Sequence, residues 1–273
     1  MRVKGRTILT KTITLIKTQK RKGRYNVYLD GKYSFPIGED VLIRFALSKG
    51  KELTDEDIEN IKEADNTSKA YQKALNYLAH QLRTKREVRD HLRQNEIAEQ
   101  DIESTLAKLA EMDLIDDLQY AQSYVRTMAK TADKGPTVIA NKLRQKGVPA
   151  VDIEEALAEF PEEQQVENGV TVAKKSAKHF HGESFRTKNN KVRQQLMQKG
   201  FSSDVINLIM DELDLQPDDQ EETAALQEQG DKLWRKNHRY EQKQRVQKVR
   251  QGLYRKGFSG DMITRYLEDK NSE

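Results

Sequence analysis

One short motif recurs along this chain, and it constrains the fold more than any other feature of the sequence. Its clear copies share a leucine, a Lys-Gly pair and a later isoleucine, and they read Leu143-Arg-Gln-Lys-Gly-Val-Pro-Ala-Val-Asp-Ile153, Leu196-Met-Gln-Lys-Gly-Phe-Ser-Ser-Asp-Val-Ile206 and Leu253-Tyr-Arg-Lys-Gly-Phe-Ser-Gly-Asp-Met-Ile263. A fainter copy begins at Leu92, so the leading leucines are 51, 53 and 57 residues apart. This interval is too long for a two-helix repeat of about 34 residues, whereas three short helices fit it. The motif therefore predicts a mainly α-helical protein of tandem three-helix repeats.

Each copy of the motif predicts a sharp corner between two helices. A glycine stands where the first helix needs a left-handed residue just past its end, and it occurs at Gly147, Gly200 and Gly257. The next helix is expected to begin at once, with an N-cap at Ser202 or Ser259 and with Pro149 in the equivalent place. The first copy has Asn95 and Glu96 in the lysine and glycine columns, and Asn95 is predicted to take the left-handed conformation.

Residues before the first repeat follow a strand pattern. Side chains alternate over Thr12 to Lys17 and over Tyr25 to Leu29. Asp30-Gly31 is typical of the type I′ turn of a β-hairpin, which would return over Lys32 to Ile37. The sequence therefore predicts a small antiparallel β region at the N-terminus.

The chain is expected to divide into five segments. Two short helices, over 40–47 and 54–63, complete the N-terminal one, and Thr54 caps the second helix. The predicted segments are a β-rich extension and four helical repeats, over 1–63, 69–112, 116–160, 163–213 and 218–270. Tandem repeats of this kind stack into an elongated, curved solenoid. Only 36% of the residues are apolar and 34% are charged, which suits that shape because a compact domain of this length buries a larger share of its surface.

Charge is distributed unevenly, and the basic clusters are candidate sites for DNA or a protein partner. Residues 1–24 carry nine Lys or Arg and no acid, 211–231 carries nine Asp or Glu and no Lys or Arg, and 232–256 carries ten basic residues against Glu241 alone. The candidates on a predicted loop of the first cluster are Lys20, Arg21, Lys22 and Arg24. Those of the last cluster are Arg235, Lys236 and Arg239. The alternative is that such runs are simply solvated helix faces.

The lysine before each corner glycine is a further candidate. These residues, Lys146, Lys199 and Lys256, would recur along one side of a solenoid and could contact successive phosphates. The alternative is structural, because a lysine in the last turn of a helix is stabilised by the exposed carbonyls and the helix dipole. The sequence leaves both interpretations open.

The residue types that most catalytic and metal sites require are missing or scattered. The chain has no cysteine, which excludes disulfides, thiolate catalysis and cysteine-bound zinc. The five histidines show no metal-binding or triad spacing. Neither Gly-Lys pair, at 31–32 or 50–51, is followed by the Ser or Thr of a phosphate-binding loop. We therefore expect no enzyme activity, no cofactor and no metal.

The sequence shows no pattern typical of a signal peptide or a membrane-spanning segment. Lys11 and several threonines interrupt residues 7–16, which lack the continuous apolar region of a signal peptide. No other run approaches membrane-spanning length. The sequence therefore predicts a cytoplasmic protein with no membrane partner.

The residues that carry the repeat resemble those of the RecX family. The corner Lys-Gly-Phe-Ser-x-Asp-x-Ile is similar to that of the family, as is Leu114-Ile-Asp-Asp-Leu-Gln-Tyr-Ala121. Residues 8–55 resemble the N-terminal extension of the longer Gram-positive members, through Gln19-Lys-Arg-Lys-Gly-Arg-Tyr-Asn-Val-Tyr-Leu-Asp-Gly-Lys-Tyr33 and Asp40-Val-Leu-Ile-Arg-Phe45. The resemblance covers nearly the whole chain, although the shorter members have three three-helix units and this chain is expected to have four.

The resemblance implies a non-enzymatic regulator that binds the RecA recombinase filament along its helical groove. It implies inhibition of strand exchange, ATP hydrolysis and co-protease activity, and we expect the chain to act as a monomer. The charge distribution leaves an alternative, which is sequence-independent binding of single- or double-stranded DNA. A steep loss of binding with added salt in the absence of recombinase would favour that alternative.

Overall fold

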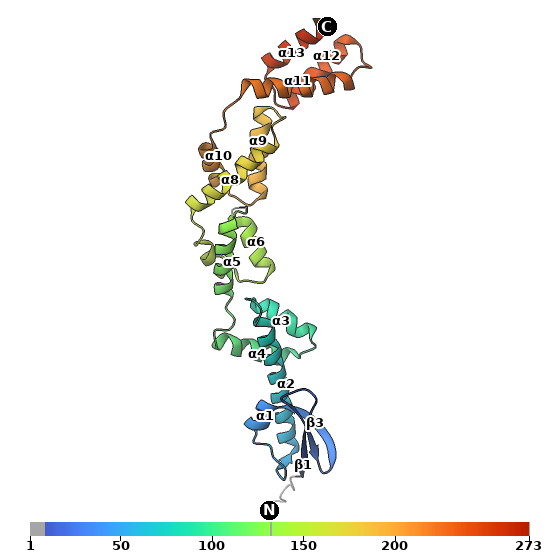
Figure 1. The fold of residues 1–273 in the computed structure, drawn as a ribbon, viewed down its shortest axis with the longest axis vertical. Helices are drawn as coiled ribbons and strands as arrows, with labels where there is room; N and C mark the ends of the chain where they lie inside the picture. Colours follow the sequence, from blue (N-terminus) through green and yellow to red (C-terminus); the bar gives the residue numbers. More distant parts are fainter. Residues whose placement is uncertain (1–8, 132, 273) are drawn as a thin grey trace, which may run out of the picture. The chain divides into compact units, whose positions relative to one another are not determined.

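The computed structural model describes residues 9–131 and 133–272. Over these residues the chain is mainly helical, with a small antiparallel sheet near the N-terminus (Figure 1). Its contacts group it into two compact units. The first unit runs to Tyr120 and includes Lys146–Val148, and the second contains Ala121–Gln145 and the chain from Pro149 onward. The predicted fold class, helical repeats behind a small β region, is confirmed.

The β region of the first unit is a four-stranded antiparallel sheet. Its strands lie in the order β3-β2-β1-β4, and they are β1 (Thr10–Thr18), β2 (Arg24–Leu29), β3 (Lys32–Gly38) and β4 (Glu52–Thr54). Asp30 and Gly31 have φ angles of 49° and 83°, as a type I′ turn requires. The sequence does not predict β4, because three residues are too few to show a period of two.

The two helices that follow differ in length from the prediction. α1 (Glu39–Arg44) ends before residue 47, because Ala46 takes a left-handed φ of 46°. α2 (Asp55–Leu78) begins at the predicted cap, where the Thr54 hydroxyl accepts a backbone N–H of the first turn. The prediction that this helix ends at residue 63 is wrong, since it runs for 24 residues. No Gly or Pro interrupts 55–78, so no local signal stops the helix.

α2 belongs to two cores. Near its start, Ile58 and Ile61 pack with the buried side chains of the sheet. Near its end, Ala74 packs with the cluster that contains Val88 and Leu92 of the first repeat. One continuous helix therefore joins the β region to the first repeat, so the two are parts of one body rather than separately hinged segments.

The helices come in groups of three, as the repeat predicts (Figure 1). α2 is followed by α3 (Lys85–Gln94) and α4 (Glu99–Glu111), and the second group is α5 (Asp117–Thr131), α6 (Pro136–Gln145) and α7 (Ala150–Leu157). The third and fourth groups are α8 (Glu162–His179), α9 (Phe185–Gln198) and α10 (Ser203–Leu213), then α11 (Asp219–Lys236), α12 (Gln242–Arg255) and α13 (Gly260–Ser272). No helix in the described part of the chain is both long and apolar enough to cross a bilayer.

Two apolar columns of the repeat form the centre of each core. They stand four residues apart on the second helix of each group, so both side chains point the same way. All eight are at most 1% exposed, and they are Val88, Ile139, Val192, Val249, Leu92, Leu143, Leu196 and Leu253. The repeating pattern in the sequence is therefore a repeating core.

The corners have the predicted backbone in three copies. The φ angles are positive at 82°, 91° and 85° for Gly147, Gly200 and Gly257. In the corners at Gly200 and Gly257, the N–H of the following phenylalanine donates back to the leading leucine, from Phe201 to Leu196 and from Phe258 to Leu253. Both predicted serine caps, Ser202 and Ser259, accept an N–H of the following helix.

The first corner corrects one prediction. Asn95 has a right-handed φ of −95°, and Glu96, in the glycine column, is left-handed with φ 60°. The N–H of Ile97 donates to the Leu92 carbonyl, which is the same hydrogen bond as in the corners at Gly200 and Gly257. This bond requires the left-handed residue immediately before Ile97, so Glu96 adopts the conformation although asparagine tolerates it better.

Candidate interaction surfaces

The corner of each later repeat packs against the second helix of the repeat before it. At all three junctions the carbonyl of the corner lysine accepts a hydrogen bond from the start of that helix. The bonds run from the Thr84 hydroxyl to Lys146 (2.7 Å), from the Gly135 N–H to Lys199 (2.7 Å) and from the Ser184 hydroxyl to Lys256 (2.5 Å). The backbone of the three candidate lysines is therefore part of the junctions between repeats.

The corner glycine has a second role at these junctions. A Cβ at Gly200 would lie 2.6 Å from the backbone nitrogen of Val138, and one at Gly257 would lie 2.8 Å from the Ser184 hydroxyl. At Gly147 the same atom would collide with Arg86. Glycine is thus required both by the left-handed backbone and by the close approach of the neighbouring repeat, and the sequence indicates only the first.

Two of the three candidate lysines have acidic partners. The ammonium of Lys146 lies 2.5 Å from Glu87, and that of Lys199 lies 3.5 Å from Asp133. Partial burial acts to lower the pKa of Lys146, but the Glu87 carboxylate and Tyr120 outweigh it and the pKa lies above its ordinary value. These contacts support the structural interpretation of Lys146 and Lys199. Among the described residues, Lys256 has no acid within ion-pair distance.

The basic loop between β1 and β2 contains three exposed cations, and a fourth cation that forms an ion pair within the first unit. Lys20, Arg21 and Lys22 are exposed and form no ion pair with any described residue. Arg24 instead makes two hydrogen bonds, of 2.7 and 3.0 Å, to Asp65 of α2. Asp65 is 2% exposed, so Arg24 compensates a buried charge and anchors the sheet to α2.

The environment of Asp65 explains why Arg24 cannot turn outward. Besides Arg24, the carboxylate accepts hydrogen bonds from the Gly38 N–H at 2.7 Å and from Lys69 at 2.7 Å. Burial acts to raise the pKa of Asp65, but these three donors outweigh it and hold the pKa below its ordinary value. The carboxylate is therefore ionised, and losing Arg24 would leave a buried charge with fewer partners.

An open groove of about 730 Å³ lies beside this loop in the first unit. Its walls carry Arg21 and Lys22 from the loop and Lys69 and Lys73 from α2, and also Glu39 and Asp40. Lys69 and Lys73 already contact Asp65 and Asn95. The groove is therefore of mixed charge, and the exposed loop is its most basic part.

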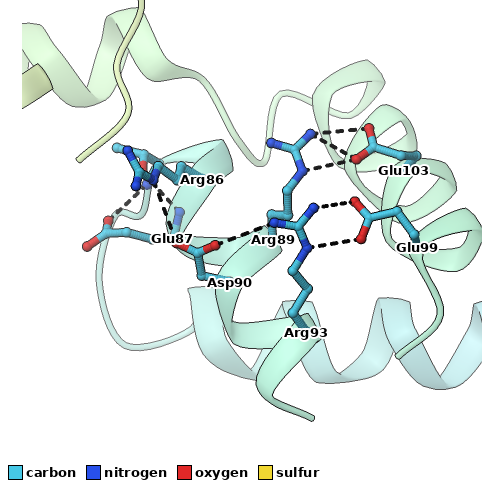
Figure 2. A network of polar contacts seen from close by, with 8 residues as sticks. Arg86, Glu87, Arg89, Asp90, Arg93, Glu99 and Glu103 are labelled. Atoms are coloured by element: carbon cyan, nitrogen blue, oxygen red, sulfur yellow. Dashed lines mark hydrogen bonds and ion pairs between the residues drawn. The ribbon is translucent and has the colours of Figure 1, made fainter. Parts of the chain in front are cut away.

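The first repeat compensates its own basic residues (Figure 2). On α3, Arg89 donates from Nε and Nη2 to the two carboxylate oxygens of Glu103 on α4, and Arg93 binds Glu99 at 2.7 Å. Asp90 of the same helix lies 3.8 Å from Arg86 and 4.0 Å from Arg93. Although α3 is rich in arginine, its surface is thus nearly neutral.

In the fourth repeat, α12 lacks such compensation, although Lys232 pairs with Glu228 and Lys270 with Asp231. α12 contains five Lys or Arg and no Asp or Glu. Of the predicted candidates near it, Arg235 donates to the Asp231 backbone carbonyl, Arg239 lies over the Tyr240 ring and Lys236 is exposed. None of these three forms an ion pair with a described residue. Exposed cations without an acidic partner among the described residues thus occur in the β1–β2 loop and the fourth repeat, and also elsewhere, as at Lys174 and Lys175 of α8.

No group of three His, Asp or Glu side chains in the described residues could hold a metal ion. Open charged surfaces of this kind suit binding, and comparison with known proteins assigns the chain to a family. Models of the first, second and third three-helix domains of RecX match residues 70–109, 116–157 and both 162–210 and 219–267, and the model of the regulatory protein RecX N-terminal domain matches 11–54. The chain belongs to the RecX family. The curated relatives carry the name regulatory protein RecX.

RecX relatives cover the chain almost from end to end. The regulatory protein RecX of Levilactobacillus brevis is 48% identical over 257 residues, 94% of this chain and 97% of the relative. That of Enterococcus faecalis is 38% identical and covers 95% and 98%. A crystal structure of regulatory protein RecX has a TM-score of 0.66 at 46% identity and covers 74% of this chain and 99% of that one. RecX from Lactobacillus salivarius gives 0.54 at 50% identity, over 56% and 99%.

The RecX models also explain the fourth repeat. One model, that of the third domain, matches both the third and the fourth repeat. The two repeats are therefore copies of one domain type, and equivalent positions in them can be compared directly. Residues shared by both repeats are those that the fold requires, and residues that differ can serve a role particular to one repeat.

Proposed function

We propose that this RecX chain binds the filament of a RecA recombinase and inhibits its strand exchange, ATP hydrolysis and co-protease activity. The observation that carries the proposal is the match of RecX models to the β region and to all four repeats. The curated relatives carry the name regulatory protein. Binding, rather than catalysis, also suits a chain whose basic residues lie on open surfaces.

Tandem repeats offer a physical reason for binding a filament. A filament presents the same protomer surface many times, and each contact by one repeat raises the effective concentration of the next repeat near its own site. Weak contacts on separate repeats then add to a stable complex. We place some of these contacts on the exposed cations Lys20, Arg21 and Lys22 and on Arg235, Lys236, Arg239 and Lys256.

Co-sedimentation with filaments preassembled on DNA tests this proposal. The full chain should pellet with the filaments and saturate at fewer than one chain per protomer, because one chain with several repeats spans several protomers. It should stay in the supernatant with unassembled recombinase. Pelleting that depends only on the amount of DNA, with no effect of recombinase, would overturn the proposal.

A further inference from the structure

We propose that the exposed face of α12 is a binding site for single-stranded nucleic acid. Lys243, Arg250 and Arg255 would bind backbone phosphates, and Tyr254 would stack on a base. Of the four repeats, only the fourth has an aromatic residue at the place of Tyr254, where the others have Arg93, Arg144 and Met197. The site needs no recombinase, so it stands or falls separately from filament binding.

The first observation is the surface itself. Val249 and Leu253 are fully buried on one side of α12, whereas Lys243, Arg250 and Tyr254 are exposed on the other side. The steps from 243 to 250 and from 250 to 254 are two turns and one turn of helix, so these side chains form one stripe. An open depression of about 480 Å³ lies among Arg250, Gln251, Tyr254 and Arg255.

The second observation comes from one arginine that recurs in three repeats. Arg89, Arg193 and Arg250 occupy the same place on the second helix, and each donates to the residue fourteen positions later. In the first repeat this residue is Glu103, which cancels the charge (Figure 2). In the third repeat it is the neutral amide of Asn207, at 2.7 Å, and in the fourth it is the neutral hydroxyl of Thr264, at 3.2 Å. Arg250 therefore keeps its charge for a ligand.

The third observation is an exchange of partners between the third and fourth repeats. Lys191 of α9 forms an ion pair with Glu183. At the equivalent positions, the Lys248 ammonium lies 4.4 Å from the centre of the Tyr240 ring. Arg245 is likewise held over the Trp234 ring, at 4.0 Å. A ring orders a cation without neutralising it, so Lys248 and Arg245 are held in place and add positive charge to this helix.

The fourth observation identifies the kind of polyanion. Tyr254 is 68% exposed, and it lies between Arg250 and Arg255. An exposed ring beside cations is the arrangement that binds single strands, in which a base is free to stack while the phosphates meet the cations. A duplex hides the faces of its bases, and an acidic protein surface offers phosphate-like charge but no base. The face of α12 therefore fits a single strand better than either.

Fluorescence anisotropy with a labelled oligothymidylate and the full-length chain, without recombinase, tests the site. The double variant Arg250→Gln/Arg255→Gln removes two cations, so binding should weaken at least ~10-fold and the slope of log K against log salt should fall by about 1.4. Tyr254→Ala should weaken binding by about 5- to 100-fold without changing that slope, because stacking involves no counterion release.

The matched control is the double variant Arg89→Gln/Arg93→Gln on α3, which removes two cations that already bind Glu103 and Glu99. It should bind the oligonucleotide within about 2-fold of the unmodified chain. Far-ultraviolet circular dichroism confirms that every variant is folded.

Several results would overturn the proposal. These are no binding by the unmodified chain, equal loss in the α3 and α12 variants, no effect of Tyr254→Ala, or equal affinity for a duplex of the same length. Displacement of the oligonucleotide by polyglutamate at the same charge concentration would instead identify the face as a site for an acidic protein.

Discussion

Replacing Gly200 by alanine perturbs the junction between the second and third repeats at one atom. Gly200 has φ 91°, and a Cβ there would lie 2.6 Å from the backbone nitrogen of Val138 and 2.8 Å from its Cγ2. A left-handed alanine costs about 1–2 kcal/mol. Crowding of a packed contact typically adds about 1–3 kcal/mol, and here the crowded atom is helix backbone, which cannot move aside alone. We expect the free energy of unfolding to fall by about 2–5 kcal/mol.

Gly50 provides the matched control for this variant. Its φ is 90°, and nothing lies within 4 Å of a Cβ built on it. Gly50→Ala therefore carries the backbone strain without the collision, and should cost only about 1–2 kcal/mol. The difference between the two variants measures the junction contact.

The assay combines urea unfolding with hydrogen exchange, because repeat proteins need not unfold in one step. Gly200→Ala should lose amide protection in α6 and α9, on both sides of the junction, whereas Gly50→Ala should leave these helices unchanged. Equal losses of stability in the two variants would refute the reasoning, since the neighbouring repeat would then contribute nothing.

Three further perturbations have defined outcomes. Ser184→Ala combined with Thr187→Val removes both hydroxyls that donate to the last corner carbonyl, and should lower the free energy of unfolding by about 1–3 kcal/mol; an unchanged urea midpoint would contradict the junction. Glu96→Gly relieves a φ of 60° and should raise the melting temperature, with a gain of up to about 1 kcal/mol; a lower melting temperature would argue against strain there. Arg24→Ala should destabilise the first unit by about 3 kcal/mol. Burial acts to raise the pKa of Asp65, but Arg24 and the other donors outweigh it and lower the pKa. The stabilisation by this pair is therefore complete above the ordinary pKa of 3.8 and is lost as pH falls through the lower folded-state pKa. Acid titration followed by circular dichroism should show that loss in the unmodified chain and less of it in the variant, and identical acid profiles would contradict the ion pair.

The repeat could be predicted from the sequence because its determinants are local. A helix end, a left-handed glycine and an N-cap follow one another within a few residues, as from Leu196 to Ser202, and each acts through its own backbone. The apolar columns are periodic and identify the buried face without knowledge of the neighbours. The hairpin at Asp30-Gly31 is predictable for the same reason.

The features that the sequence does not reveal depend on contacts between distant residues. Arg24 and Asp65 are 41 positions apart, and nothing in the basic loop distinguishes Arg24 from its exposed neighbours. The strained conformation of Glu96 follows from the geometry of the whole corner rather than from its own preference. The extra length of α2 reflects the absence of a stop signal, which is harder to detect than its presence.

The candidate surfaces were predictable only as charge, because partners decide which charge is available. Lys146 and Arg250 both stand in basic stretches, yet Lys146 binds Glu87 and Arg250 meets only a hydroxyl. For the arginine column, the signal is the residue fourteen positions later, which is Glu103 for Arg89 but Asn207 and Thr264 for Arg193 and Arg250. Aligning the repeats shows this exchange once the pairing of the helices is known.

The most direct test of regulation is the ATPase activity of a purified RecA recombinase at fixed DNA, with the full chain titrated in. We predict saturable inhibition that reaches its plateau at well below one chain per recombinase protomer and is not relieved by extra DNA. Unchanged ATP hydrolysis, or inhibition that disappears when DNA is added in excess, would contradict regulation through the filament.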